Sequence, residues 1–299
     1  MENQNTISEN RNHNARPGRM VVTSVNKSYG LGPLRQKVID CCSFTLEPGK
    51  LTVLIGPSGC GKTTIIKLLA GYEEVDSGLI VIDGEPVRGP RWERLVVFQE
   101  TALFPWKTLL QNVVFGPQIR GGKSRKEMEE EGMALLQKVG LADFRDKYPA
   151  QLSGGMQRRA ELVRALINSP LVMMMDEPFR GLDAMTRELM QEYYVRIFED
   201  HGITNLFVTS EIEEAIFLAD RLIVLSNRPA RVRAVMNIEL PRPRKFHMLT
   251  SREYLRHKRD ALEILHEEAM KAFSSGANNC AADFLEAYSH MEECPPDDK

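Results

Sequence analysis

Short apolar runs separated by turn residues recur along the first third of the chain and again beyond residue 170. Runs of about four to eight apolar or alternating residues, bounded by turns, are typical of strands. We expect strands over residues 20–29, 37–46, 51–55, 78–84, 94–100, 171–176, 205–209, 221–226 and 232–240. Because residues 51–55, apart from Thr52, and residues 171–175 form apolar runs rather than alternating patterns, they predict buried strands of a parallel sheet.

Between about residues 108 and 169 the periodicity becomes helical. Ser124 to Glu127 form a capping box, and an amphipathic stretch follows with Glu129 to Glu131 on its polar side. We interpret this block as a helical subdomain inserted into an α/β core. Further helices are expected over residues 62–70, 184–200 and 212–218, and from a cap at Ser251 to about Phe273.

The two ends of the chain lack the apolar residues of a core. Residues 1–19 are rich in Asn, and residues 274–299 are small, polar and acidic. We expect both ends to be disordered, because such segments bury too little surface to offset the entropy of ordering. The predicted organisation is a tail over 1–19, a domain over 20–241 with its helical part at about 108–169, a linker and helix over 242–273, and a second tail over 274–299.

Composition excludes several classes of protein. The 299 residues carry 41 acidic and 39 basic side chains, a balance that argues against a dedicated nucleic-acid-binding protein. No apolar run approaches the ~20 residues that span a bilayer, and the N-terminus lacks the apolar core of a signal peptide. We therefore expect a cytosolic protein that reaches a membrane only through a partner. The five cysteines lack the even count and spacing of a disulfide framework or a zinc site, which indicates reduced thiols.

Residues 51–64 carry the clearest chemical signal. Gly56, Gly61, Lys62 and Thr63 fit the phosphate-binding template G-x-x-x-x-G-K-[ST]. The glycines let backbone N–H groups surround an anion, and the helix that follows directs its positive end to the same place. Lys62 is expected to reach the β and γ phosphates of a nucleotide, and the Thr63 hydroxyl to bind Mg²⁺. The whole predicted loop comprises Gly56, Pro57, Ser58, Gly59, Cys60, Gly61, Lys62, Thr63 and Thr64, with Cys60 as a small filler.

Two carboxylates follow the apolar run 171–175. Asp176, at the end of a buried strand, can hold Mg²⁺ directly or through water. Glu177 is expected on the opposite side of the pleat, where it can accept a proton from a water that attacks the γ phosphate. The three methionines before these carboxylates indicate core packing rather than a metal or partner surface.

Three further features each allow two interpretations. Tyr29, after the first strand, is either an adenine-stacking residue or an ordinary strand-end tyrosine. Gln99 ends a strand at the sheet edge where ligands bind, so it either contacts Mg²⁺ or the attacking water or is simply a polar loop residue. Ser153, Gly154 and Gly155 open a helix and form either a second anion-binding turn or a plain N-cap.

In this order and spacing, the motifs resemble the ATP-binding subunits of ATP-binding-cassette importers over roughly residues 20–240. The resemblance implies a P-loop NTPase cassette of the α/β class, with a mixed sheet core, an N-terminal antiparallel β subdomain and an inserted helical subdomain. It implies roles for matching residues: adenine stacking for Tyr29, coupling to the membrane partner for Gln99, the family signature for Leu152 to Gln157, and magnesium ligand and catalytic base for Asp176 and Glu177. Segments 101–106, 213–221 and 226–230 resemble the nitrate, sulfonate, taurine and bicarbonate importer group.

The resemblance also implies a head-to-tail dimer with ATP and Mg²⁺ as cofactors. Two ATP molecules would lie between the phosphate loop of one cassette and Ser153 to Gly155 of the other. Gln157 belongs to the same signature, and Asp183 to a loop that crosses the interface. The partner cassette is a second copy or a paralogue. Transmembrane permease subunits and, indirectly, an external solute-binding protein would complete an importer of a small anionic solute at the inner face of the cell membrane.

Two positions depart from the family pattern. Position 210 is serine where the family has a histidine that contacts the γ phosphate; because Ser210 cannot carry that charge, we expect reduced turnover. Arg180 replaces a small residue and is expected either to alter dimer contacts or to face solvent. The departures leave a second hypothesis, a regulatory subunit with little turnover that pairs with a competent cassette, although the intact Glu177 favours an active ATPase. The single cassette and short helical insert argue against a cassette protein of DNA repair or translation.

Overall fold

The computed structural model describes residues 17–274. The two predicted tails lie outside these residues, except for 17–19 and 274. Gly18 and Arg19 are already held by the domain, because both backbone N–H groups donate to the Asp83 carboxylate at 2.8–3.0 Å.

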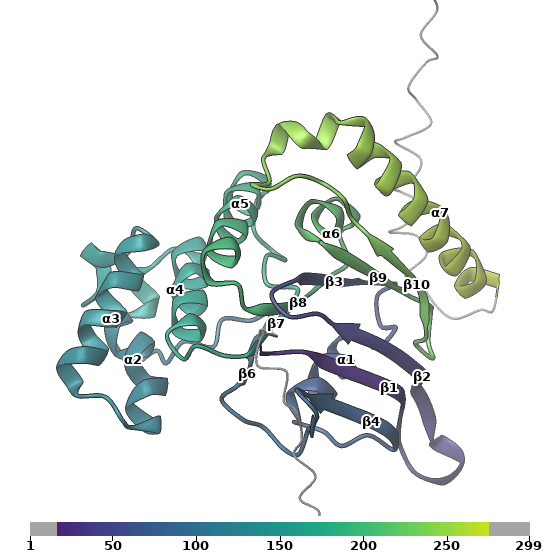
Figure 1. Cartoon of the computed structure of the whole chain (residues 1–299), viewed down its shortest axis with the longest axis horizontal. Helices are drawn as coiled ribbons and strands as arrows, with labels where there is room; N and C mark the ends of the chain where they lie inside the picture. The colour runs from purple at the N-terminus through teal and green to yellow at the C-terminus, as the bar shows by residue number, and fades with distance from the viewer. Residues whose placement is uncertain (1–16, 275–299) are drawn as a thin grey trace, which may run out of the picture.

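The strands form two sheets (Figure 1). An antiparallel sheet has the order β2-β1-β4-β5 and consists of β1 (Met20–Tyr29), β2 (Gln36–Leu46), β4 (Ser77–Ile82) and β5 (Glu85–Pro86). A second sheet has the order β10-β9-β3-β8-β7-β6 and consists of β3 (Leu51–Ile55), β6 (Arg94–Val97), β7 (Val172–Asp176), β8 (Thr204–Thr209), β9 (Arg221–Leu225) and β10 (Val232–Asn237). All its neighbours pair in parallel except β10 with β9. The predicted buried parallel strands β3 and β7 are confirmed, since every one of their residues is buried.

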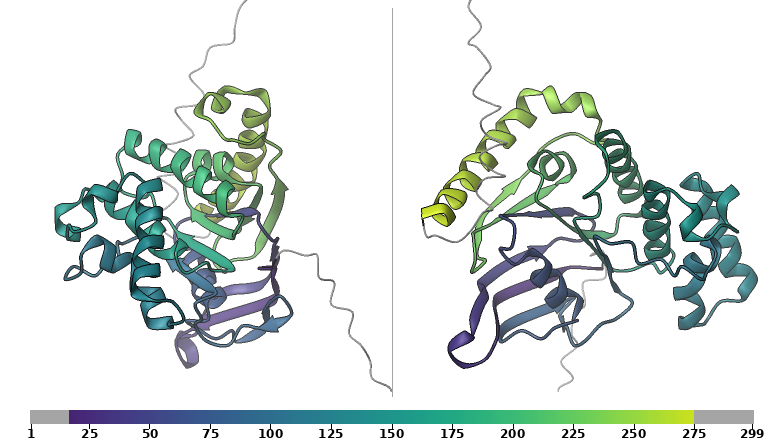
Figure 2. Two further views of the ribbon diagram at one scale, coloured as in Figure 1. Left: turned by 60° about the vertical axis from the view of Figure 1, so that its left-hand side comes forward. Right: turned by 180° about the vertical axis from the view of Figure 1, so that it is seen from behind.

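Seven α-helices lie within the described part of the chain: α1 (Lys62–Ala70), α2 (Leu109–Arg120), α3 (Arg125–Lys138), α4 (Gly154–Leu166), α5 (Ala184–His201), α6 (Ile212–Leu218) and α7 (Arg252–Ser274). Helices α2, α3 and α4 form a group at one side of the molecule, separate from the antiparallel sheet in Figure 1 and in the right-hand view of Figure 2. The predicted capping box starts α3: the Ser124 hydroxyl accepts from the Glu127 N–H, and the Glu127 carboxylate accepts from the Ser124 N–H at 2.7 Å. None of the described helices is long and apolar enough to cross a bilayer.

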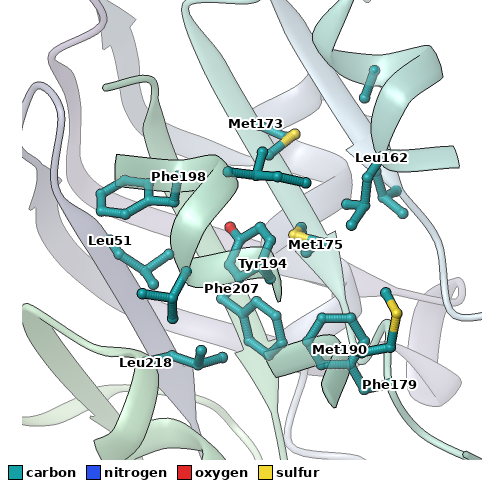
Figure 3. Close-up of a cluster of buried hydrophobic side chains, with 14 of the residues drawn as sticks. Leu51, Leu162, Met173, Met175, Phe179, Met190, Tyr194, Phe198, Phe207 and Leu218 are labelled. Atoms are coloured by element: carbon teal, nitrogen blue, oxygen red, sulfur yellow. The ribbon is translucent and has the colours of Figure 1, made fainter. Parts of the chain in front are cut away.

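The larger hydrophobic core includes side chains of β7, and part of it is shown in Figure 3. Met173 and Met175 are buried there beside the aromatic rings of Phe179, Tyr194 and Phe207. The Phe207 ring centroid lies 5.5 Å from those of both Phe179 and Tyr194. The interpretation of the methionine run as core packing is therefore confirmed, and the segment that follows Asp176 is anchored by Phe179.

Two strands end three residues earlier than the hydrophobic pattern predicts. β6 ends at Val97 rather than at residue 100, and β10 ends at Asn237 rather than at residue 240. After β6, the carbonyl oxygens of Phe98 and Gln99 accept hydrogen bonds from the guanidinium of Arg158 on α4, at 2.7 Å for Phe98. Gln99 therefore lies in a bend that α4 holds, rather than at the end of a strand.

Candidate functional site

The phosphate loop connects β3, in the interior of the main sheet, to α1. Gly61 has φ of 123°, and a Cβ atom there would come within 2.9 Å of the Ile39 side chain, so only glycine fits. The buried Lys62 side chain turns back over the loop, and its ammonium donates to the carbonyl oxygens of Gly56 and Pro57 at 2.8 and 3.1 Å. The sequence thus builds the predicted loop and places its lysine inside it.

Asp176 ends β7 beside the first turn of α1. Burial raises the pKa of the Asp176 carboxyl, and a hydrogen bond with the Thr63 side chain opposes that rise. Carboxylate and hydroxyl oxygens are the donors that Mg²⁺ takes in nucleotide sites, where it also keeps water and phosphate ligands. The pair fits Mg²⁺, and Gln99, a third predicted ligand, borders the same pocket.

Glu177 lies at a backbone turn rather than across the pleat from Asp176. Its φ is +43°, a left-handed conformation that a non-glycine residue rarely adopts, and its N–H donates to the Val208 carbonyl at 2.9 Å. This conformation ends β7 and brings both carboxylates to one pocket. The expectation that Glu177 lies on the opposite side of the pleat from Asp176 was wrong for this reason.

Three side chains surround the Glu177 carboxylate, which is only 11% exposed. The Ser210 hydroxyl donates to Oε1 at 3.0 Å, and the Lys62 ammonium lies 3.8 Å from the same oxygen. The Arg180 guanidinium donates to Oε2 through Nη1 at 2.8 Å. Arg180 was expected to alter dimer contacts or face solvent. Its side chain is 58% exposed, as the second alternative predicts, and its guanidinium also forms an ion pair with Glu177.

Lys62, Glu177 and Arg180 share a pocket of about 320 Å³, which Ser210 does not line. It is lined by Tyr29, Val38, Ser58, Gly59, Gly61, Lys62, Thr63, Thr64, Gln99, Asp176, Glu177, Arg180 and Arg228. Arg228, which sequence reasoning did not place in the site, follows β9, the parallel neighbour of β3. Since parallel strands bring their carboxyl ends to one edge, that position could have been deduced once β9 was paired with β3.

Tyr29 stands at the edge of this pocket and is 37% exposed. Its hydroxyl donates to the Glu73 carboxylate, and the Lys27 ammonium lies 5.4 Å from the ring centroid. Burial, and the hydrogen bond to Glu73, raise the pKa of the Tyr29 hydroxyl. The ring is thus anchored at its rim position, where adenine stacking stays a prediction.

Ser153, Gly154, Gly155 and Asp183 lie in a different pocket, of about 630 Å³, which shares no lining residue with the first. The Ser153 and Asp183 side chains cap α4 and α5, accepting from the N–H groups of Met156 and Thr186 at 3.3 and 3.0 Å. The chain therefore divides the predicted nucleotide contacts between two pockets.

Five predicted site residues border neither pocket: Gly56, Pro57, Cys60, Gln157 and Ser210. The Gln157 amide donates to the carbonyl oxygens of Pro149 and Leu152 at 3.0 and 3.1 Å, so it braces the turn before α4. Cys60 is fully buried, which raises the pKa of its thiol. Its predicted role as a small filler agrees with this burial.

Comparison with known proteins gives the relationships of the chain. A family described as "ABC transporter" matches residues 39–180. An uncharacterised ABC transporter ATP-binding protein of Methanocaldococcus jannaschii is 39% identical over 254 residues, which cover 85% of this chain and 94% of the relative. The taurine import ATP-binding protein TauB of Chromobacterium violaceum is 46% identical over 197 residues, 66% of this chain and 75% of the relative. The bicarbonate transport ATP-binding protein CmpD of Synechococcus elongatus is 37% identical over 254 residues, 83% of this chain and 90% of the relative.

Solved structures of similar fold also include ATP-binding cassettes. A dimeric ATP-binding cassette in a post-hydrolysis state, bound to ADP and Pi, matches with a TM-score of 0.64 at 25% identity, covering 74% of this chain and all of that one. The cassette CbiO1 of Clostridium perfringens shares the fold with a TM-score of 0.67 at 24% identity, covering 83% of this chain and 97% of that one. The predicted cassette fold is confirmed, and the chain belongs to the ABC transporter family as an ATP-binding cassette.

Proposed function

We propose that this chain is the ATP-binding and ATP-hydrolysing subunit of an importer that moves a small anionic solute through a transmembrane permease. The observation that carries the proposal is the convergence of Lys62, Thr63, Asp176 and Glu177 in one pocket at the carboxyl ends of parallel strands. Two relatives named for taurine import and bicarbonate transport support import of a small solute.

Nucleotide binding uses groups that are already in place. The loop N–H groups and the start of α1 receive the phosphates, and Lys62 exchanges the carbonyl oxygens of Gly56 and Pro57 for phosphate oxygens. Thr63, Asp176 and Gln99 would hold Mg²⁺. When bound, Mg²⁺ offsets the negative charge of the β and γ phosphate oxygens.

Hydrolysis requires a base at the γ-phosphate end of the pocket, and Glu177 is the base in this proposal. A water attacks the γ phosphorus, its proton passes to the Glu177 carboxylate, and the bond from phosphorus to the β-γ bridging oxygen breaks to release ADP. Ser210 holds one oxygen of that carboxylate at 3.0 Å and so orients it.

The division into two pockets favours a dimer. Ser153 to Gly155 and Asp183 share no pocket with Lys62, so a second chain must supply them if they contact the same nucleotide. The partner is a second copy or a paralogue, and a solved relative is itself a dimeric cassette. The pair would bind the permease at the inner face of the membrane, and an external solute-binding protein would deliver cargo to the permease.

The surface that would face the permease surrounds Phe104. Trp106 is 71% exposed, and its ring packs 5.6 Å from that of Phe104. An adjoining hollow of about 410 Å³ is lined by Phe98, which directly precedes Gln99, and by Phe104 and Phe115. A permease segment bound there would lie next to the Gln99 bend and would move when that bend moves.

The test is phosphate release by the purified chain with its permease. Glu177→Gln should reduce the rate by more than about 100-fold while ATP still binds, and Lys62→Ala should abolish binding. An unchanged rate with Glu177→Gln would contradict its assignment as the base. The alternative of a regulatory cassette with little turnover is not favoured, since the pocket retains this carboxylate beside the phosphate loop.

A further inference from the structure

We propose that Arg180 supplies the positive charge at the γ phosphate that Ser210 cannot supply. In this proposal the Arg180 guanidinium leaves Glu177 and binds a γ-phosphate oxygen when ATP enters. The inference rests on the proposed function, because it concerns the same pocket and the same nucleotide.

The backbone of Arg180 is fixed, whereas its guanidinium is exposed. Its N–H donates to the Glu177 carbonyl at 3.2 Å, which closes a turn, and the adjacent Phe179 is only 1% exposed in the core. The Arg180 side chain is 58% exposed, so its guanidinium can change partner without disturbing packing. The turn therefore delivers a long, flexible cation to the rim of the nucleotide pocket.

Ser210 and Arg180 each contact a different oxygen of the Glu177 carboxylate. Ser210 donates to Oε1 of Glu177 at 3.0 Å, and Arg180 donates to Oε2 at 2.8 Å. A histidine at position 210 combines a hydrogen-bond donor with a titratable charge, whereas serine offers the donor alone. In this chain Ser210 provides the hydrogen-bond donor and Arg180 provides the charge, and both contact the Glu177 carboxylate.

The charges of the pocket favour the exchange of partner. The Lys62 ammonium lies 3.8 Å from Oε1, so a single carboxylate separates the Lys62 and Arg180 cations. A bound triphosphate adds about four negative charges beside Lys62, and a guanidinium pairs with phosphate oxygens through a planar fork. Once Arg180 moves to the phosphate, Oε2 of Glu177 is free to accept the proton of the attacking water.

A different role for Arg180 must be separated from this one. In the alternative role, Arg180 stays paired with Glu177 and acts only by neutralising or restraining that carboxylate, a contact that contributes little to stability because it is exposed. In that case, removing the charge of Glu177 also removes any effect of Arg180 on ATP. Direct contact with the γ phosphate predicts that the effect persists.

The decisive measurement is nucleotide affinity in a Glu177→Gln background, which also blocks hydrolysis. Adding Arg180→Ala should weaken ATP binding by about tenfold or more, the loss expected for one charge-assisted hydrogen bond, and should change ADP binding less than about twofold. Arg256→Ala, which removes an exposed arginine of α7 outside the pocket, is the matched control. Equal ATP affinity with and without Arg180 would overturn the proposal. If the Glu177→Gln parent binds neither nucleotide, the proposed function fails instead.

A kinetic experiment tests the link to position 210. In the chain with Glu177 intact, Arg180→Ala should lower kcat by about 100-fold, the usual loss for one transition-state donor, and Arg180→Lys should lose less. Adding Ser210→His to Arg180→Ala should restore at least about tenfold, because the histidine returns a charge to the same place. A higher kcat with Arg180→Ala, or no recovery with Ser210→His, would contradict the proposal.

Discussion

Replacing Ser210 with alanine tests how this pocket orients its base. The substitution removes the hydrogen bond from the Ser210 hydroxyl to Oε1 of Glu177 at 3.0 Å and leaves the Arg180 contact to Oε2 in place. A hydrogen bond to a charged group contributes about 1.5–3 kcal/mol. Because Arg180 and Lys62 still face the carboxylate, we take the lower end of that range, and 1.4 kcal/mol corresponds to a tenfold change in rate.

The assay is steady-state ATP hydrolysis, with kcat and KM measured separately. Ser210→Ala should lower kcat about tenfold and leave KM within about twofold, since the serine contacts the base in the structure. Ser77→Ala, on the exposed start of β4, is the control for loss of a hydroxyl. Ser210→Ala should have no further effect on kcat in a Glu177→Gln background. A kcat that stays within twofold of the parent refutes the view that this hydroxyl orients the base.

Three further predictions concern other described groups. Asp176→Asn should raise the Mg²⁺ concentration needed for half-maximal hydrolysis by at least about tenfold, because it removes the charged oxygen donor beside Thr63; an unchanged Mg²⁺ titration would exclude Asp176 as a ligand. Arg228→Ala should raise the KM for ATP several-fold at constant kcat, because Arg228 lines the pocket rim; an equal KM would remove it from the site. Burial raises the pKa of Glu214, so its contribution to stability is present below the ordinary glutamate pKa of about 4.3 and is lost as pH rises through the higher folded value. The Tm of Glu214→Gln relative to that of the parent should therefore rise between about pH 5 and pH 8. A difference in Tm that stays constant over this range would contradict the assignment.

Local patterns were enough to predict much of the fold. The capping box at Ser124 marked the start of α3, and the predicted helix over 212–218 coincides with α6. The phosphate loop was also predictable, because the glycines, the lysine and the preceding strand are contiguous and fix one another's conformation. Each of these features depends on residues close together in the chain.

The features that sequence reasoning missed depend on contacts between distant segments. Ser210 reaches Glu177 across 33 positions, and Arg158 holds the Gln99 carbonyl across 59. The left-handed turn at Glu177 contains no glycine by which it could have been predicted. It is held by a hydrogen bond to Val208 on the neighbouring strand. Periodicity describes which face of an element is apolar, and it carries no information on such pairings.

The hydrogen bonds from Arg158 to the bend after β6 make α4 a rigid connection between the pocket at Ser153 and the pocket at Lys62. The helix starts at the Ser153 turn in one pocket, and one turn later its guanidinium holds the Phe98 and Gln99 carbonyls at the border of the other. Arg158 is itself buried against Glu161 at 2.7 Å, so the connection has little freedom to slip. In the proposed dimer, a ligand bound at the start of α4 and a ligand bound beside Gln99 would be coupled through this one helix. Thermodynamic reciprocity then requires that each ligand change the affinity for the other by the same factor.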